Sequence, residues 1–338
     1  MELRELATLP GVAGNEKEVR DAIMKELATM GVQFETDVLG NVVARKGNTG
    51  PKVLVDAHMD EVGLMIVYIE KNGFLRFAAV GVPASVLLSK RVYIGKDKVP
   101  GVIGAKAIHL QQPKERETVI PVDQIFIDTG AKSKEEAEKK VKVGDYAVFD
   151  TEYEELSPGV VKSKALDDRV GCMLLFEVLK EEWEGIRLHA VFATQEEIGT
   201  RGARISSYRV GPDMGIALEG TICADIPLAD KDSYATRLGG GAVVSVMDRS
   251  SIPNRSMVDQ LVKLARDNSI PFQFREATSG GNDAGAIQAA RAGCPVASLS
   301  VPCRYIHTPF AVMSQNDFDA AKALLIAFLK SVEGGFRP

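Results

Sequence analysis

Two adjacent carboxylates, Glu196 and Glu197, come just after an apolar alternating run over 187–192 that predicts a β-strand. Neighbouring residues of a regular strand point to opposite faces, so both side chains can face one site only where the backbone turns. With such a turn, one carboxylate can bind a metal ion while the other reaches a water held by that metal. The structural alternative is a pair of solvated glutamates at a strand end, the commoner arrangement for acidic residues.

Residue types that bind metals also stand at other predicted strand ends and at one predicted helix start. They are His58 and Asp60 after the run 53–57, Glu219 after 215–218, His307 shortly after 297–301, and Asp167 and Asp168 at the start of a helix that ends at Lys180. Ligands of open α/β sheets gather beyond the carboxyl ends of the strands, so these side chains are expected to converge. Each of these residues has an alternative, purely structural role, such as a structural histidine, a loop residue or, for either aspartate, a helix N-cap. The joint pattern is harder to attribute to chance.

The spacing of His58 and Asp60 has a specific physical use. Residues i and i+2 of a strand share a face, so Asp60 can accept the ring N–H of His58 and leave the other nitrogen for a metal. Histidines and carboxylates without a thiolate suit zinc, cobalt or manganese. Five ligand side chains are too many for one tetrahedral zinc ion and suit two metals that share a bridging carboxylate. Two such metals can lower the pKa of a water and polarise a carbonyl, while a nearby non-ligand glutamate moves the proton to a leaving amine.

The composition of the 338-residue chain is that of an ordinary globular protein, with 45% hydrophobic and 26% charged residues. A net charge of −5 without any basic block argues against nucleic acid or an anionic membrane as a partner. The charged start, Met1 to Glu5, lacks a signal-peptide apolar region, and no apolar run approaches the roughly 20 residues of a membrane span. The four cysteines are scattered, which indicates reduced core residues of a cytoplasmic protein rather than a thiolate zinc site.

Alternating predicted helices and strands indicate an α/β fold with a mixed, largely parallel sheet sandwiched by helices. Between about residues 67 and 162 the pattern changes to strand-like pieces separated by turn signals such as Asn72-Gly73 and Pro100-Gly101. The expected organisation is one catalytic α/β domain, residues 1–66 and 163–338, interrupted by a small β-rich domain, residues 67–162.

Five segments together resemble the cytoplasmic glutamyl, or tetrahedral (TET-type), aminopeptidases, a family whose members are sometimes labelled cellulase M. They are Asp56-Ala57-His58-Met59-Asp60-Glu61-Val62-Gly63, Lys164-Ala165-Leu166-Asp167-Asp168-Arg169, Gln195-Glu196-Glu197-Ile198-Gly199-Thr200-Arg201-Gly202-Ala203, Gly280-Gly281-Asn282-Asp283-Ala284 and Arg304-Tyr305-Ile306-His307-Thr308-Pro309. The resemblance covers nearly the whole chain. It implies a zinc-peptidase-like fold in which the β-rich insertion is a PDZ-like dimerisation domain.

The resemblance further implies a dinuclear metallo-aminopeptidase that removes N-terminal residues from short peptides. The implied metal ligands are His58 and Glu219 for one ion, Glu197 and His307 for the other, and Asp167 as the bridge, with Glu196 as general base and Asp60 orienting His58. Two divalent ions per subunit are expected, zinc or cobalt first and manganese as a third option. Dimers of this family assemble into a hollow tetrahedral homododecamer with interior active sites. Two positions depart from the family's usual residues: Glu219, often aspartate, and Asn282, more often threonine.

Other functions stay open at this point. A carboxypeptidase or deacylase can use the same dinuclear site, and Arg255 or Arg304 is available to hold a terminal carboxylate. A glycosidase needs two carboxylates roughly 5–10 Å apart across a sugar bond, for which adjacent glutamates are poorly placed. A non-catalytic assembly protein would leave the ligand set without a purpose. The preferred N-terminal residue is also open: an acidic preference needs a basic pocket, for which Arg201, Arg237 and Arg255 are candidates.

Overall fold

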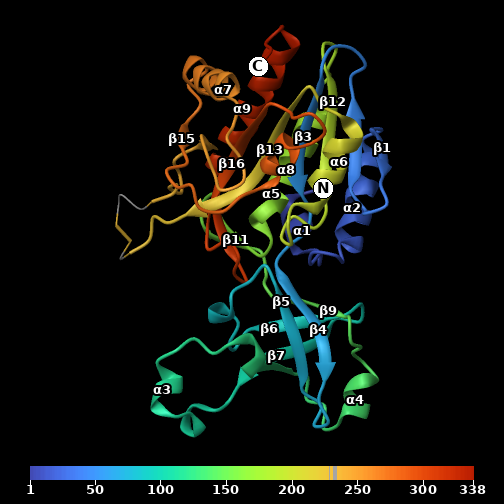
Figure 1. The fold of residues 1–338 in the computed structure, drawn as a ribbon, viewed down its shortest axis with the longest axis vertical. Helices are drawn as coiled ribbons and strands as arrows, with labels where there is room; N and C mark the ends of the chain where they lie inside the picture. Colours follow the sequence, from blue (N-terminus) through green and yellow to red (C-terminus); the bar gives the residue numbers. More distant parts are fainter. Residues whose placement is uncertain (228, 231–233) are drawn as a thin grey trace.

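The chain forms two lobes joined by two short crossings (Figure 1). The computed structural model describes residues 1–227, 229–230 and 234–338. The larger lobe holds a mixed β-sheet with helices on both faces, and both chain termini lie in it (Figure 1). The smaller lobe is a β-barrel built from the middle of the chain. The predicted fold class, a mixed sheet between helices with a small β-rich unit, is therefore confirmed.

One sheet organises the larger lobe, in the strand order β1-β2-β12-β3-β13-β16-β17-β11-β10, with β14 and β15 attached beside β16. Its strands are β1 (Gln33–Thr36), β2 (Val42–Lys46), β3 (Lys52–His58), β10 (Glu154–Ser157), β11 (Val160–Ser163), β12 (Arg187–Ala193), β13 (Met214–Cys223), β14 (Ala242–Val244), β15 (Phe272–Phe274), β16 (Val296–Arg304) and β17 (Ala311–Ser314). The central strands β12, β3, β13 and β16 are parallel, whereas both edges of the sheet pair antiparallel. These central strands are almost wholly buried because helices cover both faces.

Two layers of helices cover the sheet. One layer consists of α1 (Leu3–Thr8), α2 (Lys17–Thr29), α5 (Leu166–Lys180), α7 (Arg255–Asp267) and α9 (Gln315–Glu333), and the other of α6 (Arg201–Val210) and α8 (Asp283–Gln288). Alternate residues of β3 divide between the two cores, since Val53 and Val55 pack with the first layer and Leu54 with the second. Within the described ranges, none of these helices combines the length and apolarity that a membrane crossing requires.

The smaller lobe is a closed barrel of antiparallel strands in the order β4-β5-β8-β7-β6-β9. Its elements are β4 (Gly63–Ile69), β5 (Leu75–Val80), β6 (Arg91–Ile94), β7 (Val99–Ala105), β8 (Ile125–Asp128), β9 (Tyr146–Phe149), the short helices α3 (Pro113–Arg116) and α4 (Lys134–Glu138), and three 3-10 turns at Ala84–Val86, Ile108–Leu110 and Val122–Gln124. Leu64 and Ile66 of β4 point inward with residues of the other strands and form a core of their own. The barrel therefore has its own hydrophobic support.

Strand pairing divides the chain near the predicted boundaries of the insertion but not at them. The first barrel strand, β4, already begins at Gly63. The hairpin of β10 and β11 lies inside the predicted insertion, yet β11 pairs with β17 in the large sheet. The division into a catalytic and an inserted domain stays a prediction, as do the PDZ-like character and the dimerisation role of the barrel.

Buried charges tie the two crossings together. The chain leaves the larger lobe after Glu61 and has returned by Lys164, whose Nζ lies 2.7 Å from Glu61 Oε1. Burial lowers the pKa of Lys164 to about 8, although the charge of Glu61 opposes this shift. Arg169, fully buried in α5, donates from Nε to the carbonyl of Met59 at 2.9 Å. These contacts hold the end of β3 against the start of α5, the two elements that carry His58 and Asp167.

Candidate metal centre

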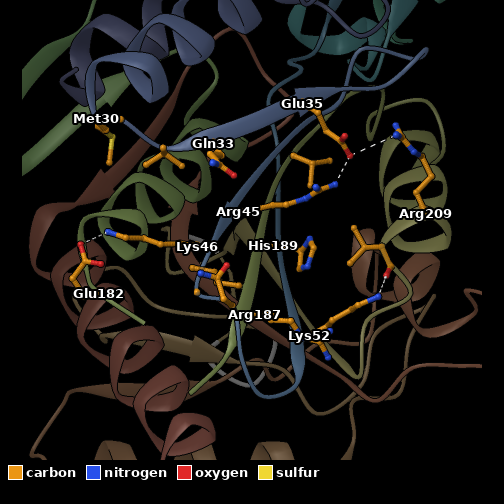
Figure 2. A pocket seen from close by; sticks show the side chains of 17 residues that line it. Met30, Gln33, Glu35, Arg45, Lys46, Lys52, Glu182, Arg187, His189 and Arg209 are labelled. Carbon is orange, nitrogen blue, oxygen red and sulfur yellow. Dashed lines mark hydrogen bonds and ion pairs between the residues drawn. The ribbon is translucent and has the colours of Figure 1, made fainter. Parts of the chain in front are cut away.

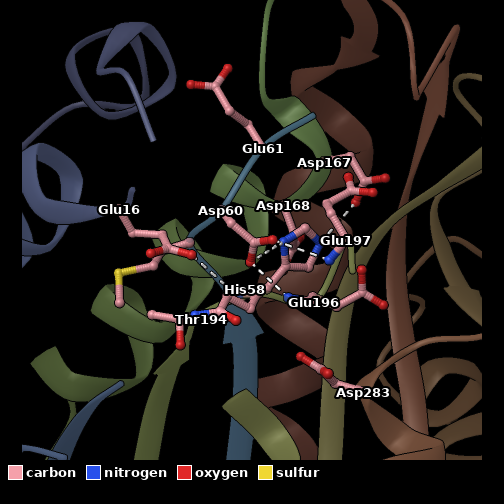
Figure 3. Close-up of polar contacts among 12 residues, drawn as sticks. Glu16, His58, Asp60, Glu61, Asp167, Asp168, Thr194, Glu196, Glu197 and Asp283 are labelled. Carbon is pink, nitrogen blue, oxygen red and sulfur yellow. Dashed lines mark hydrogen bonds and ion pairs between the residues drawn. The ribbon is translucent and has the colours of Figure 1, made fainter. Parts of the chain in front are cut away.

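The predicted metal-binding residues gather at one end of the large sheet, around a cavity of about 380 Å³. The residues of this group that line the cavity are His58, Asp167, Glu196, Glu197, Glu219 and His307. They converge because the parallel strands β3, β12 and β13 all deliver their carboxyl ends to the same edge. Figure 3 shows His58 between the carboxylates of Asp60 and Asp167, with Glu196 and Glu197 beside it.

The backbone turns where β12 ends, as a shared site for two adjacent glutamates requires. Gln195 (φ 56°) and Thr200 (φ 52°) both adopt the left-handed conformation on either side of the pair. The carboxylate of Asp60 holds this turn: Oδ1 accepts from the N–H of Glu196 at 3.0 Å and Oδ2 accepts from the N–H of Glu197 at 3.1 Å. One side chain at the end of β3 thereby fixes the backbone of both glutamates.

His58 faces a different carboxylate with each ring nitrogen. Its Nδ1 lies 3.5 Å from Asp60 Oδ1, while its Nε2 lies 3.5 Å from Asp167 Oδ1 and 3.7 Å from Glu219 Oε2. One ligand atom each from His58, Asp167 and Glu219 lie within 4.8 Å of one another, a spacing that can hold a metal ion. The ring is buried, and Asp60 is on its far side from the cavity, where an orienting carboxylate belongs.

His307 makes a second such group with Asp167 and Glu197. Its Nδ1 lies 2.8 Å from the carbonyl oxygen of Gly81, so Nδ1 carries the proton and donates it there. Its other ring nitrogen, Nε2, makes no hydrogen bond to Gly81 and lies 3.8 Å from Asp167 Oδ2. Gly81 follows the barrel strand β5 directly, so the smaller lobe orients a side chain of the site.

The two adjacent aspartates have different environments. Asp167 directs Oδ1 toward His58 and Oδ2 toward His307, so its carboxylate lies between the two groups. Asp168 instead accepts the N–H of Gly171 at 3.0 Å through Oδ1 and caps the first turn of α5. The capping role that the sequence left open for either aspartate thus falls to Asp168.

Crowding of carboxylates in a buried space shifts their proton affinities. Burial raises the pKa of Glu196 to about 8; the charge of His58 opposes this shift, and the charge of Asp283 adds to it. Burial also holds the pKa values of Glu197 and Glu219 well above their usual range. Burial disfavours the protonated form of His58, but the neighbouring carboxylates of Asp167 and Asp60 outweigh this and raise its pKa. The site therefore holds more carboxylates than its neighbouring cationic side chains can neutralise.

Several buried oxygens at this end have no hydrogen-bond partner among the described residues. Both carboxylate oxygens of Asp56 and of Asp283 are in this state, as is Oδ1 of Asp167. The carboxyls of Asp56 and Asp283 lie against each other, so a shared proton satisfies this pair. An unpaired buried polar atom is costly, and Asp167 lines the cavity, so a cation is the chemically fitting partner for its Oδ1. Sequence reasoning assigned no role to Asp56 or Asp283, although both lie within segments that carry the resemblance. Their pKa values are raised by burial, that of Asp56 to about 7.

The arginines considered from the sequence do not line this cavity. Arg304 forms a two-pronged ion pair with Asp225, with both contacts at 2.7 Å, and Arg255 pairs with Asp259 on α7. The remaining two, Arg201 and Arg237, contact Gln195 and the ring of Tyr234. The arginine that does line the cavity is Arg275, just beyond β15, which sequence reasoning missed. No local pattern identifies it, because its place depends on how β15 joins the sheet.

A larger cavity, about 960 Å³, lies at the opposite ends of the same strands (Figure 2). Its charged and titratable lining is mostly basic: Arg45, Lys46, Lys52, Arg187, Arg209 and His189, against Glu35 and Glu182. Within the described residues, the groups of histidine, cysteine and carboxylate that could hold an ion are all at the other end, around His58 and His307. We therefore place the chemistry at the acidic end of the sheet.

The chain is similar to known proteins over nearly its whole length. The sequence profile of the M42 glutamyl aminopeptidase family matches residues 40–324. A putative aminopeptidase of Escherichia coli K12 is 36% identical over 336 residues, which cover 98% of this chain and 94% of the relative. The lysyl aminopeptidase of Pyrococcus furiosus is 33% identical over 335 residues, covering 96% of this chain and 95% of that protein.

A solved structure is similar over the same length. The TET1 peptidase of Pyrococcus horikoshii, described as able to assemble into a tetrahedron or a large octahedral shell, superposes with a TM-score of 0.86 at 32% identity. The match covers 96% of this chain and 97% of that chain. Both lobes are therefore included in the similarity.

Proposed function

The chain belongs to the M42 glutamyl aminopeptidase family and is a peptide hydrolase of the aminopeptidase type, and from this premise we propose that it removes N-terminal residues from short peptides with the help of two divalent metal ions. The single observation that carries the two-metal proposal is the position of Asp167. Its two carboxylate oxygens face two different histidines, His58 and His307. A carboxylate that bridges two cations needs this arrangement.

The residues present fit a pair of metal ions. His58 and Glu219 would hold one ion, Glu197 and His307 the other, and Asp167 both. The excess of buried carboxylates and the unpaired Oδ1 of Asp167 support this assignment, because cations would neutralise them. Zinc or cobalt fits these nitrogen and oxygen donors, and manganese is a third option. When bound, the ions supply Lewis acidity that makes a water more acidic and polarises the scissile carbonyl.

Glu196 is the proposed general base. It lines the cavity beside the ligands, and the hydrogen bond from its N–H to Asp60 fixes its backbone. In this role its carboxylate takes a proton from the attacking water and delivers it to the leaving amine. Asp60 acts as a positioning residue, because it touches His58 and the backbone of the glutamate pair without lining the cavity.

Another dinuclear hydrolase, a carboxypeptidase above all, is the alternative to test. The two arginines that the sequence offered for a terminal carboxylate are both paired, Arg304 with Asp225 and Arg255 with Asp259. Arg275, however, lines the cavity and could hold such a group. An assay must therefore separate recognition of a free amine from recognition of a free carboxylate.

The test is a panel of amino-acid p-nitroanilides, each with a free and an N-acetylated amine, assayed with and without chelator and with added Zn²⁺ or Co²⁺. We expect cleavage of free-amine substrates alone, lost with chelator and restored by metal. Equal cleavage of the acetylated substrates would shift the function to a different dinuclear hydrolase. Hydrolysis of glycosides that resists a chelator would favour a glycosidase function. No hydrolysis with any metal would favour a non-catalytic assembly protein.

Assembly and location are part of the proposal. We propose a homo-oligomer, supported by the assemblies described for the TET1 peptidase of Pyrococcus horikoshii, and specifically barrel-mediated dimers that build a dodecamer. Sedimentation of the metal-loaded protein as a monomer would contradict this. A cytoplasmic location is supported by the four cysteines, which are all buried and free.

A further inference from the structure

Four consecutive backbone N–H groups, those of residues 194–197, are each bound by a buried side-chain oxygen. Asn41 Oδ1 accepts the first at 2.9 Å, Glu16 Oε1 the second at 3.2 Å, and the carboxylate of Asp60 the other two at 3.0 and 3.1 Å. In a regular strand or helix, backbone carbonyls would bind such groups. The acceptors come from three segments far apart in the chain, so distant side chains set the shape of the turn that carries the two glutamates.

Among these acceptors, Asn41 binds both ends of the loop that joins β12 to α6. It directly precedes β2, which pairs antiparallel with β12, and its side chain therefore lies beside the end of β12. Its Oδ1 accepts the N–H and the hydroxyl of Thr194 at 2.9 and 3.1 Å, while Nδ2 donates to the carbonyl of Gly202 at 3.1 Å. Nδ2 also donates to Asp37 Oδ2 at 2.7 Å. These contacts use the whole hydrogen-bonding capacity of the amide.

The loop is closed tightly around this amide. The N–H of Gly202 donates to the carbonyl of Thr194 at 2.9 Å, and a Cβ on Gly202 would clash with that carbonyl oxygen and with Asn41 Oδ1. Within the loop, the carbonyl of Glu196 accepts the N–H of Gly199 at 2.8 Å. Removal of the amide would leave the N–H of Thr194 and the carbonyl of Gly202 buried without this partner, so the loop would have to move to satisfy them.

We propose that Asn41 is a positioning residue of the peptidase reaction, which joins the two ends of the loop and so directs Glu196 and Glu197 into the metal centre. The inference rests on the proposed roles of these glutamates, as general base and metal ligand, and adds the residue that holds them in place. Asn41 is uncharged and does not line the metal-centre cavity. A substitution there leaves the ligand set and the charge of the site unchanged, and can act only through the loop.

The experiment compares the metal-loaded wild type with Asn41→Ala and with a matched control, Asn254→Ala. Asn254 also accepts two backbone N–H groups, those of Ser256 and Met257, but it caps α7 away from the cavity lining. In Asn41→Ala, kcat on the best free-amine p-nitroanilide should fall about 10- to 100-fold, with KM changed less than about threefold. Asn254→Ala should lower the melting temperature but keep the kcat of the wild type.

Metal titration of the chelator-stripped protein supplies a readout that does not depend on turnover. Because the loop carries Glu197 but not His58 or Glu219, Asn41→Ala should weaken the binding of one ion and spare the other. Equal weakening of both ions would overturn the inference. Wild-type kcat in Asn41→Ala would overturn it too, as would an equal loss of kcat in Asn254→Ala.

Amide hydrogen exchange of the metal-free wild type decides the matter even if Asn41→Ala does not fold. We expect the N–H groups of residues 194–197 to exchange slowly, although they lie in no helix or strand. Rapid exchange of these four groups would contradict the proposed fixation of the loop. A wild type that cleaves no free-amine substrate with any metal would instead contradict the aminopeptidase proposal, while exchange and metal titration would still test the role of Asn41.

Discussion

The two ends of the central strands carry opposite charge and use it differently. At the carboxyl ends of β3 and β12, carboxylates crowd around His58 (Figure 3). At the amino ends of the same strands, Lys52 and Arg187 lie with other cations around His189 (Figure 2). Both ends raise an electrostatic problem, because like charges share a small space.

The basic end pairs its charged side chains within the protein, although Nδ1 of His189 is buried there without a hydrogen-bond partner among the described residues. Arg45 contacts Glu35 at 2.5 Å and Lys46 contacts Glu182 at 2.8 Å. Lys52 donates to the carbonyl of Val210 at 3.1 Å, and the Nε of Arg187 donates to the carbonyl of Gly50 at 2.8 Å. At the acidic end, Oδ1 of Asp167 has no hydrogen-bond partner among the described residues, and the buried carboxyls of Asp56 and Asp283 have only each other. Charged side chains that are paired within the protein indicate a structural role, whereas buried charged groups without partners indicate a binding site for a ligand.

The largest effect is expected from Glu196→Gln at the acidic end. Removal of the proposed general base should lower kcat by a factor of about 10² to 10⁴ while bound metal, measured by elemental analysis, is unchanged. Turnover close to that of the wild type would remove Glu196 from the mechanism.

The same variant tests whether the acidic end is electrostatically strained. Without metal, the pKa of folded Glu196 is about 8 against an ordinary value of 4.5, so the folded state holds a proton that the unfolded chain has released. Stability of the metal-free wild type should therefore fall as the pH rises through that window, more than in Glu196→Gln. Melting temperatures at several pH values measure this difference.

A smaller effect is expected from Asp60→Ala, which leaves the cavity lining intact. The substitution removes the carboxylate that faces His58 and holds both glutamate N–H groups. Metal affinity or activity should fall about 10- to 100-fold. Metal titration of the chelator-stripped protein checks this, and unchanged affinity together with unchanged turnover would show that Asp60 positions nothing.

His189 tests the basic end through pH. Burial and the charges of Arg45, Lys52 and Arg187 lower the pKa of His189 to about 4. In the unfolded chain the imidazole takes up its proton once the pH falls below its ordinary pKa of 6.5, whereas in the folded state it does so only near pH 4. The stability that neutral His189 contributes is therefore fully present above pH 6.5 and is lost as the pH falls toward 4. With a discount for its partial exposure, this loss amounts to about 1 kcal/mol. Denaturant unfolding of wild type and His189→Gln should differ in slope between these pH values, and parallel curves would contradict the assignment.

The smallest effect is expected from Glu35→Gln, the counterpart of Glu196→Gln at the opposite end of the sheet. Glu35 pairs with Arg45 and Arg209 in a solvent-exposed setting. Exposed pairs contribute less than about 1 kcal/mol, and no proposed catalytic group is nearby. Unfolding free energy should change little and kcat/KM not at all. A large loss of activity would break the distinction between the two ends.

Much of the fold could be predicted from the sequence because its signals are local. The apolar runs of β3, β12, β13 and β16 identify the parallel centre, and residues at their ends converge for topological reasons alone. The backbone turn at Gln195 also followed from chemistry, since two adjacent glutamates cannot otherwise share a site. The metal and catalytic roles of these residues stay predictions.

What the sequence did not reveal depends on distant contacts. Arg275 reaches the cavity only because β15 pairs with β14, which in turn pairs with β16. The hairpin of β10 and β11 joins the large sheet because β17, about 150 residues later, accepts it as a neighbour. Asp283 lies beside Asp56 although the two are far apart in the chain. Neither periodicity nor spacing within a segment carries such information.

The contact between Gly81 and His307 has a consequence for protein engineering. Gly81 lies in the turn after β5 with φ 69°, and a Cβ there would come within 2.8 Å of Glu197 Oε2. The barrel is thus no detachable module: a truncated version, or a chimera with a relative's barrel, must reproduce this turn in glycine. Otherwise the larger lobe keeps its histidines and carboxylates but loses the carbonyl that accepts a hydrogen bond from Nδ1 of His307.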